Sequence, residues 1–346
     1  MSVITELKRK TIYNPTSTEL VDEALVIGGS PSGIINFTKP TNKWSLNLWD
    51  QMLNNTWFPK ETDMNPDKRA YNLLNDDEHL MYDRALSQLI FNDSEQTNNL
   101  VDNINPYVTD PMINALLTRQ AFEEALHSQT YAVMVEDISP NTDLLYNMHR
   151  SDPVLANKNA FIANMYADLA RPTEETFALA CVANNILEGI VFFGGFVALW
   201  SLGDKMMGSA KQISFICRDE KTHLALFKNM HNTLMRQYPT LRSDMVTRRA
   251  IELIKEAVEI EINWAKYITN GKILGFSDTA IEWYVKDKGN TIARNLGYGT
   301  IYDGDMGKSP LSALEEKYED PNGIRTNFFE GTVTNYSKGS LNMEDF

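Results

Sequence analysis

Hydrophobic residues recur every three or four positions along most of this chain, with polar residues between them. That spacing is typical of amphipathic α-helices, and the strict alternation that indicates a β-strand never extends over a useful length. We therefore predict an all-α protein. Helices are expected to begin near Trp44, Asn75, Asp110 and Arg171, to run through residues 213–230, and to cover residues 244–268 and 278–297.

Two of the predicted helices have recognisable first residues. Asn75 comes directly before three acids, Asp76-Asp77-Glu78, which suits an N-cap followed by negative charge at the positive end of the helix dipole. Asp110 comes before Pro111, and proline is well tolerated at the first position of a helix. These local signals fix where the two helices begin.

Both ends of the chain lack helical periodicity. Residues 1–45 combine polar residues with glycine and proline, and we expect an extended segment that lies on the helical body. From about Tyr302 the chain is rich in glycine, proline, asparagine and acids, and residues 337–346 are expected to form a flexible tail. The sequence thus predicts an N-terminal extension (1–45), a helical domain (46–325) and a C-terminal tail (326–346).

Ionisable residues interrupt the apolar faces of four predicted helices. Asp93 lies seven residues after Leu86 on one apolar stripe, and Glu188 stands alone in a strongly apolar stretch. The others are Glu124 with His127 on one helix and Glu220 with His223 on another. A carboxylate on a core face must be paired or bound to metal, or it loses its charge. Glu259 and Glu261, by contrast, belong to a charge-rich helix, and we expect them on its solvated face.

These ionisable residues form one pattern that occurs twice, a lone carboxylate followed by Glu-x-x-His. Asp93 precedes Glu124 by 31 residues, and Glu188 precedes Glu220 by 32. One such motif alone is more often a buried histidine bonded to a glutamate. Two copies on the helices of a bundle are typical of a dinuclear metal centre. Four carboxylates and two imidazoles favour iron or manganese, because zinc more often takes thiolates or three imidazoles.

Tyr131 follows His127 by four residues on the same helix face. It can be a core tyrosine with a hydrogen-bonded hydroxyl. It can also be a phenol that loses an electron and a proton to an oxidising metal pair. Phe192, Phe196 and Ile216 lie one or two helical turns from the acids of the second copy, and we expect them to form a dry pocket around that phenol.

Composition and charge exclude several classes of protein. The formal net charge of −14 argues against nucleic acid and against an anionic membrane surface as partners, because both require lysine and arginine. Residues 177–202 are apolar enough to resemble a membrane span, but Glu188 would lie near mid-bilayer, so we interpret them as a core helix. Cys181 and Cys217 form no CxxC motif, which suits a reducing cytoplasm. The first 15 residues do not resemble a signal peptide.

From about Trp57 to its C-terminus, the chain resembles the small, radical-generating subunit of class I ribonucleotide reductase. The resemblance rests on Asp93, on Phe122-Glu123-Glu124-Ala125-Leu126-His127-Ser128-Gln129-Thr130-Tyr131, on Glu188 with Phe192 and Phe196, and on Arg218-Asp219-Glu220-Lys221-Thr222-His223. Near the end of the chain, the matching residues are Asn327-Phe328-Phe329-Glu330, Tyr336 and Glu344-Asp345-Phe346.

This resemblance implies a ferritin-like helical bundle, a homodimer and a separate large catalytic subunit. It implies that the reduced metal pair reacts with dioxygen, that Tyr131 becomes a stable radical, and that the large subunit reduces ribonucleoside diphosphates to deoxyribonucleotides. Trp57 and Asp219 match the internal radical-transfer positions of the family, with the first histidine ligand as the link at the metal. Tyr336 matches the tail tyrosine that passes the radical on, and the tail ending in Phe346 matches the segment that docks into the large subunit.

Several alternatives remain open. A member of this family can store the oxidant on a manganese pair, with a flavodoxin-like activating protein, even when a tyrosine occupies position 131. Another ferritin-like di-metal oxidase would need a substrate cavity at the metals, but neither Tyr131 nor Tyr336. An iron-storage or ferroxidase protein would form a cage from a shorter chain. A helical scaffold would leave four core-facing carboxylates unexplained.

Overall fold

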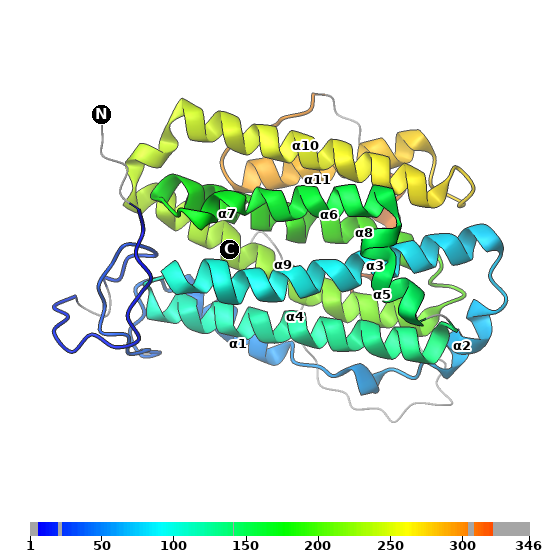
Figure 1. Cartoon of the computed structure of the whole chain (residues 1–346), viewed down its shortest axis with the longest axis horizontal. Coiled ribbons are helices and arrows are strands. Elements are labelled where there is room, and N and C mark those ends of the chain that lie inside the picture. Colours follow the sequence, from blue (N-terminus) through cyan, green and yellow to red (C-terminus); the bar gives the residue numbers. More distant parts are fainter. Residues whose placement is uncertain (1–5, 20–22, 141, 304–307, 321–346) are drawn as a thin grey trace.

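A computed structural model describes residues 6–19, 23–140, 142–303 and 308–320, and these residues form a bundle of long helices that lie along one axis (Figure 1). Within those ranges no β-strand occurs, and the only β-type pairing is an isolated bridge between Ile27 and Val108. The all-α prediction is therefore confirmed. The α-helices are α1 (Trp44–Asn54), α2 (Asn65–Tyr71), α3 (Asp76–Asn99), α4 (Pro111–Ile138), α5 (Thr142–Ser151), α6 (Pro153–Met165), α7 (Glu174–Ile186), α8 (Phe192–Trp200), α9 (Met207–Gln237), α10 (Asp244–Thr269), α11 (Asp278–Asn295) and α12 (Ser312–Tyr318).

The predicted helix starts have the expected caps. The Asn75 side chain accepts a 3.0 Å hydrogen bond from the backbone N–H of Glu78, and α3 begins at the next residue. The Asp110 carboxylate accepts hydrogen bonds from the first free N–H groups of α4, the closer at 2.9 Å from Met112. Such caps satisfy backbone donors that have no partner inside a helix. They place the helices that carry Asp93 and Glu124 in a fixed register.

The apolar stretch predicted to be a core helix is one continuous helical segment. It comprises α7, a π-helical turn at Leu187–Val191, and α8. By length and hydropathy alone it could cross a membrane, but 89% of its most apolar window is buried inside the protein. The π turn carries Glu188, and π turns inside α-helices are frequently found at functional sites. The segment is therefore a core element that is distorted where it presents an acid.

The N-terminal segment lies against one end of the bundle, at the left of Figure 1. Val26 and Ile27 are fully buried, and the N–H of Leu7 donates a 2.7 Å hydrogen bond to the carbonyl of Pro172. No helix occurs among its described residues before Trp44. The division of the whole chain into three parts stays a prediction, because residues 321–346 lie outside the described residues.

The short helix α12 was not predicted. Its seven residues carry too little periodicity to stand out, and isolated helices of this length are unstable in water. Tertiary packing stabilises it, because the buried Tyr318 ring stacks on Trp200 of α8 with ring centroids 6.3 Å apart. The helix thereby covers the end of the core segment.

The prediction that Glu261 lies on a solvated face is wrong, whereas Glu259 is exposed as expected. Glu261 falls on the buried face of α10, three residues before the buried Trp264. Its carboxylate lies 2.5 Å from the ammonium of Lys158 on α6, which is equally buried. The ion pair explains how α10 accommodates an acid in the core, because a buried charge needs a partner.

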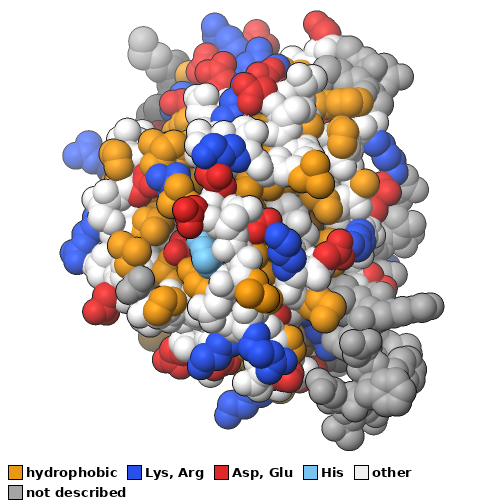
Figure 2. Space-filling model, turned by 90° about the vertical axis from the view of Figure 1, so that its right-hand side faces the viewer, with side chains coloured by type: hydrophobic (Ala, Val, Ile, Leu, Met, Phe, Trp, Pro, Cys, Tyr) orange, Lys and Arg blue, Asp and Glu red, His pale blue; other side chains and the backbone are white. Residues whose placement is uncertain are grey.

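Charged side chains are mixed on the surface. On the face drawn in Figure 2, lysine and arginine alternate with aspartate and glutamate, and small apolar groups lie between them. Among the described side chains of this face, basic residues do not gather into the continuous patch that a nucleic-acid backbone requires.

Candidate metal centre

The ionisable residues singled out from the sequence converge in the middle of the bundle. Asp93 comes from α3, Glu124 and His127 from α4, Glu188 from the π turn, and Glu220 and His223 from α9. All six side chains are fully buried. Four separate helical segments therefore direct these six buried acids and imidazoles into one small volume.

The six residues form two overlapping sets. In each set, one ligand atom from every residue lies within 4.8 Å of the others. The sets are Asp93, Glu124, His127 and Glu220, and Glu124, Glu188, Glu220 and His223. Glu124 and Glu220 belong to both sets, which the sequence pattern did not indicate because it grouped the residues by copy.

Glu124 and Glu220 have the geometry of bridging carboxylates. Glu124 places Oε1 3.2 Å from His223 Nδ1 and Oε2 3.5 Å from His127 Nδ1. Glu220 places Oε1 3.1 Å from His127 Nδ1 and Oε2 2.7 Å from His223 Nδ1. Each carboxylate thus presents one oxygen to each imidazole. Two ions placed between these groups would share both glutamates.

The donor set fits two metal ions. Several of its buried oxygen atoms have no hydrogen-bond partner, and leaving such atoms unsatisfied is costly. They are Asp93 Oδ2, Glu124 Oε2, Glu188 Oε2 and Glu220 Oε1. One unsatisfied oxygen on each of four converging carboxylates, together with the two Nδ1 atoms, is a ligand set suited to iron or manganese.

The pKa values show how strongly this site attracts positive charge. Burial raises the pKa of Asp93 and of Glu188 well above the ordinary range. Burial opposes the charged form of His127 and His223, but hydrogen bonds and charges from the surrounding carboxylates raise the pKa of both imidazoles well above the usual value. Positive charge on the two imidazoles is therefore favoured, because it balances the negative charge of the surrounding carboxylates. Metal ions would replace the imidazole protons, since ligands bind in their deprotonated forms.

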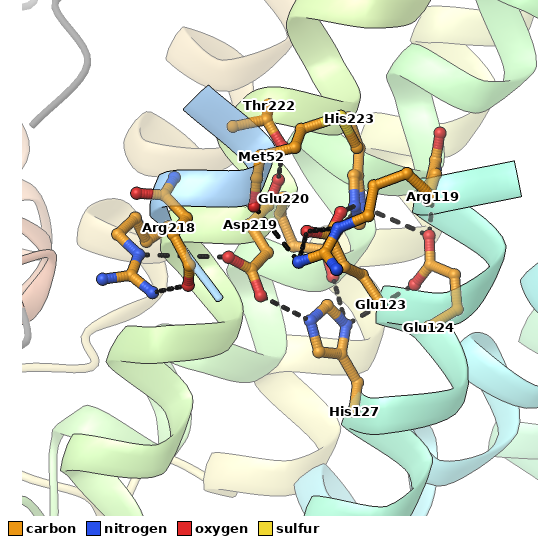
Figure 3. A network of polar contacts seen from close by, with 12 residues as sticks. Met52, Arg119, Glu123, Glu124, His127, Arg218, Asp219, Glu220, Thr222 and His223 are labelled. Atoms are coloured by element: carbon orange, nitrogen blue, oxygen red, sulfur yellow. Dashed lines mark hydrogen bonds and ion pairs between the residues drawn. The ribbon is translucent and has the colours of Figure 1, made fainter. Parts of the chain in front are cut away.

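A second acid holds the far nitrogen of each imidazole (Figure 3). Asp219 Oδ2 lies 3.2 Å from His127 Nε2, and Glu123 Oε2 lies 3.0 Å from His223 Nε2. Such contacts orient a metal-binding histidine and fix its tautomer. Sequence analysis identified Asp219 but missed the role of Glu123. The available signal was that both Glu-x-x-His motifs come directly after an acid.

Trp57 binds Asp219, the acid that contacts His127. Its indole Nε1 donates a 2.6 Å hydrogen bond to Asp219 Oδ2, the same oxygen that faces His127. The indole is fully buried and stacks on Phe215 with ring centroids 4.9 Å apart. The structure therefore joins His127, Asp219 and Trp57 into one continuous polar chain.

A family model described as "Ribonucleotide reductase, small chain" matches residues 34–310 of this chain. The chain belongs to the ribonucleotide reductase small-chain family. It is 35% identical over 352 residues to the ribonucleoside-diphosphate reductase subunit beta of Treponema pallidum, and the match covers 100% of this chain and 99% of that protein. The corresponding protein of Halalkalibacterium halodurans is 28% identical over 340 residues, with 97% of each chain covered.

Solved structures agree with this family membership. The ribonucleotide reductase R2 subunit from Clostridium botulinum is 30% identical, with a TM-score of 0.86 over 91% of this chain and 100% of that chain. A dimanganese(II)-NrdF from Streptococcus sanguinis shares the fold at 17% identity, with a TM-score of 0.72 over 81% of this chain and 98% of that chain. The resemblance and the ferritin-like bundle expected from the sequence are thus confirmed.

The tyrosine expected to carry a radical in this small chain lies in a closed environment. Tyr131 is fully buried, and its hydroxyl makes no hydrogen bond of normal geometry. Burial, followed by the negative charges of Asp93 and Glu220, raises the pKa of this phenol well above its usual value. Tyr131 is therefore a neutral phenol at any physiological pH.

The structure describes some of the remaining residues predicted from the sequence but not all of them. Phe192, Phe196 and Ile216 are fully buried, and the first two rings stack with centroids 5.9 Å apart. Their arrangement as a pocket around Tyr131 stays a prediction. Tyr336 lies outside the described residues, as does the whole predicted docking tail.

Three amide side chains that sequence analysis missed also reach the metal centre of this small chain. Gln96, Gln120 and Asn184 all direct their nitrogen atoms at Glu188 Oε1, at 2.6, 3.0 and 3.3 Å. Gln120 also donates a 2.9 Å hydrogen bond to Glu124. A sequence signal existed, because Gln120 and Asn184 each lie four residues before an acid of the site.

Proposed function

We propose that this small chain holds a dinuclear iron or manganese centre that oxidises Tyr131, and that the radical passes to a large catalytic subunit. That partner would reduce ribonucleoside diphosphates to deoxyribonucleotides, as the names of the relatives from Treponema pallidum and Halalkalibacterium halodurans indicate. The observation that carries the proposal is the pair of overlapping ligand sets, which share Glu124 and Glu220 in a fully buried site.

The residues around Tyr131 determine how it can be oxidised. When bound, the metal pair supplies electrons that reduce dioxygen and the oxidising power that removes one electron from the phenol. A buried phenol cannot separate charge in a medium of low dielectric constant, so its proton must leave together with the electron. Asp93 is the acid whose charge acts most strongly on the phenol, and it is also the acid that interacts with the hydroxyl through a weak hydrogen bond. We assign Asp93 as the first acceptor of that proton.

The chain of His127, Asp219 and Trp57 is the proposed route by which the oxidising equivalent leaves. Oxidation of an indole makes its N–H strongly acidic, and Asp219 already accepts a hydrogen bond from that N–H at 2.6 Å. The proton can therefore move a short distance while the electron moves a long one. Beyond Trp57 we assign the next step to Tyr336 in the tail, whose last residue is Phe346, and we propose that this tail docks into the large subunit.

We further propose a homodimer that functions in the cytoplasm. Cys181 and Cys217 are buried, free thiols, which agrees with a reducing compartment. The sequence resemblance supports the homodimer.

The metal and the radical can be tested together. Apoprotein is loaded with Fe(II), exposed to oxygen and examined by EPR, in the wild type and in Tyr131→Phe. A tyrosyl doublet that is lost in the variant supports the proposal. If iron gives no radical, and manganese loading with a flavodoxin-like activator gives an active reductase that shows no tyrosyl signal, the oxidant is stored on the metals and the Tyr131 assignment is wrong.

The docking tail requires a separate experiment. Removal of residues 337–346 should abolish nucleotide reduction with the large subunit and leave the radical signal intact. Unchanged reduction would contradict the docking assignment without affecting the metal centre.

A further inference from the structure

The hydrogen bonds on Glu188 are strongly unequal between its two oxygen atoms. Oε1 accepts from Gln96 at 2.6 Å, from Gln120 at 3.0 Å and from Asn184 at 3.3 Å. Oε2 is buried and has no partner. Three donors on one oxygen therefore fix the orientation of the carboxylate and leave the other oxygen available.

Gln96, the closest of these donors, is itself held by a chain of amides that leads toward the surface. Its Oε1 accepts a 3.2 Å hydrogen bond from Asn99 Nδ2, and Asn99 Oδ1 accepts one of 3.2 Å from Asn103 Nδ2. Gln96 is fully buried, Asn99 is nearly so, and Asn103 is exposed. The residues are spaced by three and then four positions along α3 and the π-helical turn Leu100–Ile104, so they follow one helix face.

The direction of every hydrogen bond in this row of amides follows from the two acceptor oxygens at its inner end. Gln96 Nε2 faces both Glu188 Oε1 and Asn184 Oδ1, the latter at 2.5 Å, so the nitrogen must point inward. Its oxygen then points outward and requires a donor, which fixes Asn99, and Asn99 fixes Asn103 in the same way. The three amide dipoles are aligned with their positive ends toward Glu188. Aligned hydrogen bonds polarise and strengthen one another.

We propose that Gln96, oriented by Asn99 and Asn103, is a positioning residue that makes Glu188 a metal ligand through Oε2 alone. Asp93, the corresponding lone acid of the other set, has no such group of amides. Its Oδ1 lies 3.0 Å from His127 Nδ1, and its Oδ2 has no partner. The two metal positions are thus made unequal by residues outside the ligand set. This inference rests on the proposed function, because it concerns how that metal centre is assembled.

The test is a titration of full-length apoprotein with Mn(II), in which EPR measures the free ion. Gln96→Met keeps the length of the side chain but removes its donor. Outer residues that orient a ligand typically contribute 10–100-fold to metal affinity. We therefore expect one Mn(II) equivalent with wild-type affinity and the other bound roughly 10–100-fold more weakly. Asn99→Leu should weaken the same equivalent by a smaller factor, and Asn103→Ala by less again.

Two control variants separate positioning from general damage to the fold. Asn98→Ala changes an exposed amide on the same helix, and Asn159→Leu changes a buried amide on α6 whose side chain has no hydrogen bond. Both should bind two ions as the wild type does. The Gln96→Met apoprotein should keep the cooperative unfolding and the helical circular dichroism of the wild type, and the structure of its manganese form should show both oxygens of Glu188 within bonding distance of metal.

The outcomes also distinguish this inference from the function on which it rests. If wild-type protein fails to bind two ions, the proposed function itself fails. If the wild type binds two ions and both Gln96→Met and Asn99→Leu bind them equally well, only the positioning role is overturned. Equal weakening of both equivalents, together with a loss of cooperative unfolding, would show that Gln96 merely supports the fold and would also overturn it.

Discussion

Trp57 and Asp219 are 162 residues apart in the chain, yet the indole Nε1 of one donates a 2.6 Å hydrogen bond to Oδ2 of the other. The same oxygen lies 3.2 Å from His127 Nε2. One carboxylate oxygen therefore links the metal centre to the segment between α1 and α2. The next residue along, Phe58, is 54% exposed, so the polar chain ends close to the surface. A buried carboxylate with two donors on one oxygen is held firmly, which suits a fixed path for protons and electrons.

Asp219→Ala should separate radical formation from radical use. The variant leaves all six proposed ligands in place, so the tyrosyl EPR signal should form, but Trp57 and His127 lose their shared acceptor. Residues that hydrogen-bond to a metal ligand typically contribute 10–100-fold to activity. We therefore expect nucleotide reduction per radical to fall by about 10-fold or more. The measurement is reductase activity with the large subunit, divided by the radical content from EPR.

The matched control for that experiment is Glu123→Ala, which removes the equivalent acid from His223. It should lower metal affinity but leave the activity per radical close to that of the wild type. Wild-type activity per radical in Asp219→Ala would contradict the proposed route.

Glu124→Ala should weaken both metal positions. Each of its oxygens faces a different imidazole, at 3.2 and 3.5 Å, so no other side chain replaces it at either position. Asp93→Ala and Glu188→Ala should each weaken only one position, because each belongs to a single set. Anaerobic Fe(II) titration of the three apoproteins measures this. If Glu124→Ala loses only one equivalent of Fe(II), the glutamate does not bridge the two positions. That outcome would agree with the sequence pattern, in which Glu124 belongs to the first copy alone.

The sequence was sufficient to predict that the six acids and imidazoles of the candidate metal site face the core, because the signals that place them there are local. Asp110 and the proline after it begin α4, and the 3.6-residue period then determines which residues of that helix face inward. An acid on an otherwise apolar face, such as Asp93 or Glu188, is conspicuous because burying it costs free energy. The duplicated motif added the information that two such faces must meet.

Features that depend on how helices pack were not predictable in the same way. Glu261 lies in a charge-rich stretch, and only the position of Lys158 on α6 shows that it is buried in an ion pair. Gln96 is a common helix residue, and its role depends on a carboxylate 92 positions away. The bridging by Glu124 likewise requires both imidazoles to be in place. Side chains that act across helix interfaces have no periodic signature within one helix.

Tyr131→Phe should not destabilise the protein, although it removes the proposed radical. The Tyr131 hydroxyl is buried without a hydrogen bond of normal geometry, and Asp93 is the one carboxylate that interacts with it through a weak hydrogen bond, so its removal relieves most of a desolvation penalty. We expect the free energy of unfolding of the apoprotein to stay the same or rise by about 1 kcal/mol. Urea denaturation of the wild type and the variant measures it. A loss of 2 kcal/mol or more, roughly the cost of breaking a buried hydrogen bond, would show that the hydroxyl makes a full hydrogen bond.

Lys158→Met should strongly destabilise the protein, because it leaves the Glu261 carboxylate buried without its counter-ion. Removal of one partner from a buried pair typically costs roughly 3–5 kcal/mol. The carboxylate packs directly against Gly194, where an added Cβ would lie 2.0 Å from its Oε1, so any side chain larger than glycine at that position would displace it. The double variant Lys158→Met/Glu261→Leu should recover most of the loss, because apolar replacements of buried ion pairs are often neutral. If the single variant loses less than 1 kcal/mol, well below that range, the pair is not a structural ion pair.

The destabilisation by Lys158→Met should also depend on pH. Burial raises the pKa of Glu261 above its ordinary value of 4.5, and loss of the lysine charge, which opposes that shift, raises it further. The folded variant then binds a proton that the unfolded chain releases, so its stability falls as pH rises through the folded pKa. The difference in unfolding free energy from wild type should therefore grow as pH rises from about 5 to about 7. Burial also lowers the pKa of Lys158 to about 8, so wild-type measurements are best kept at or below that pH. Urea denaturation over this pH range measures the stability of each protein. The stability of Lys158→Met/Glu261→Gln, which has no carboxyl group at position 261, should not show the fall with rising pH that Lys158→Met shows.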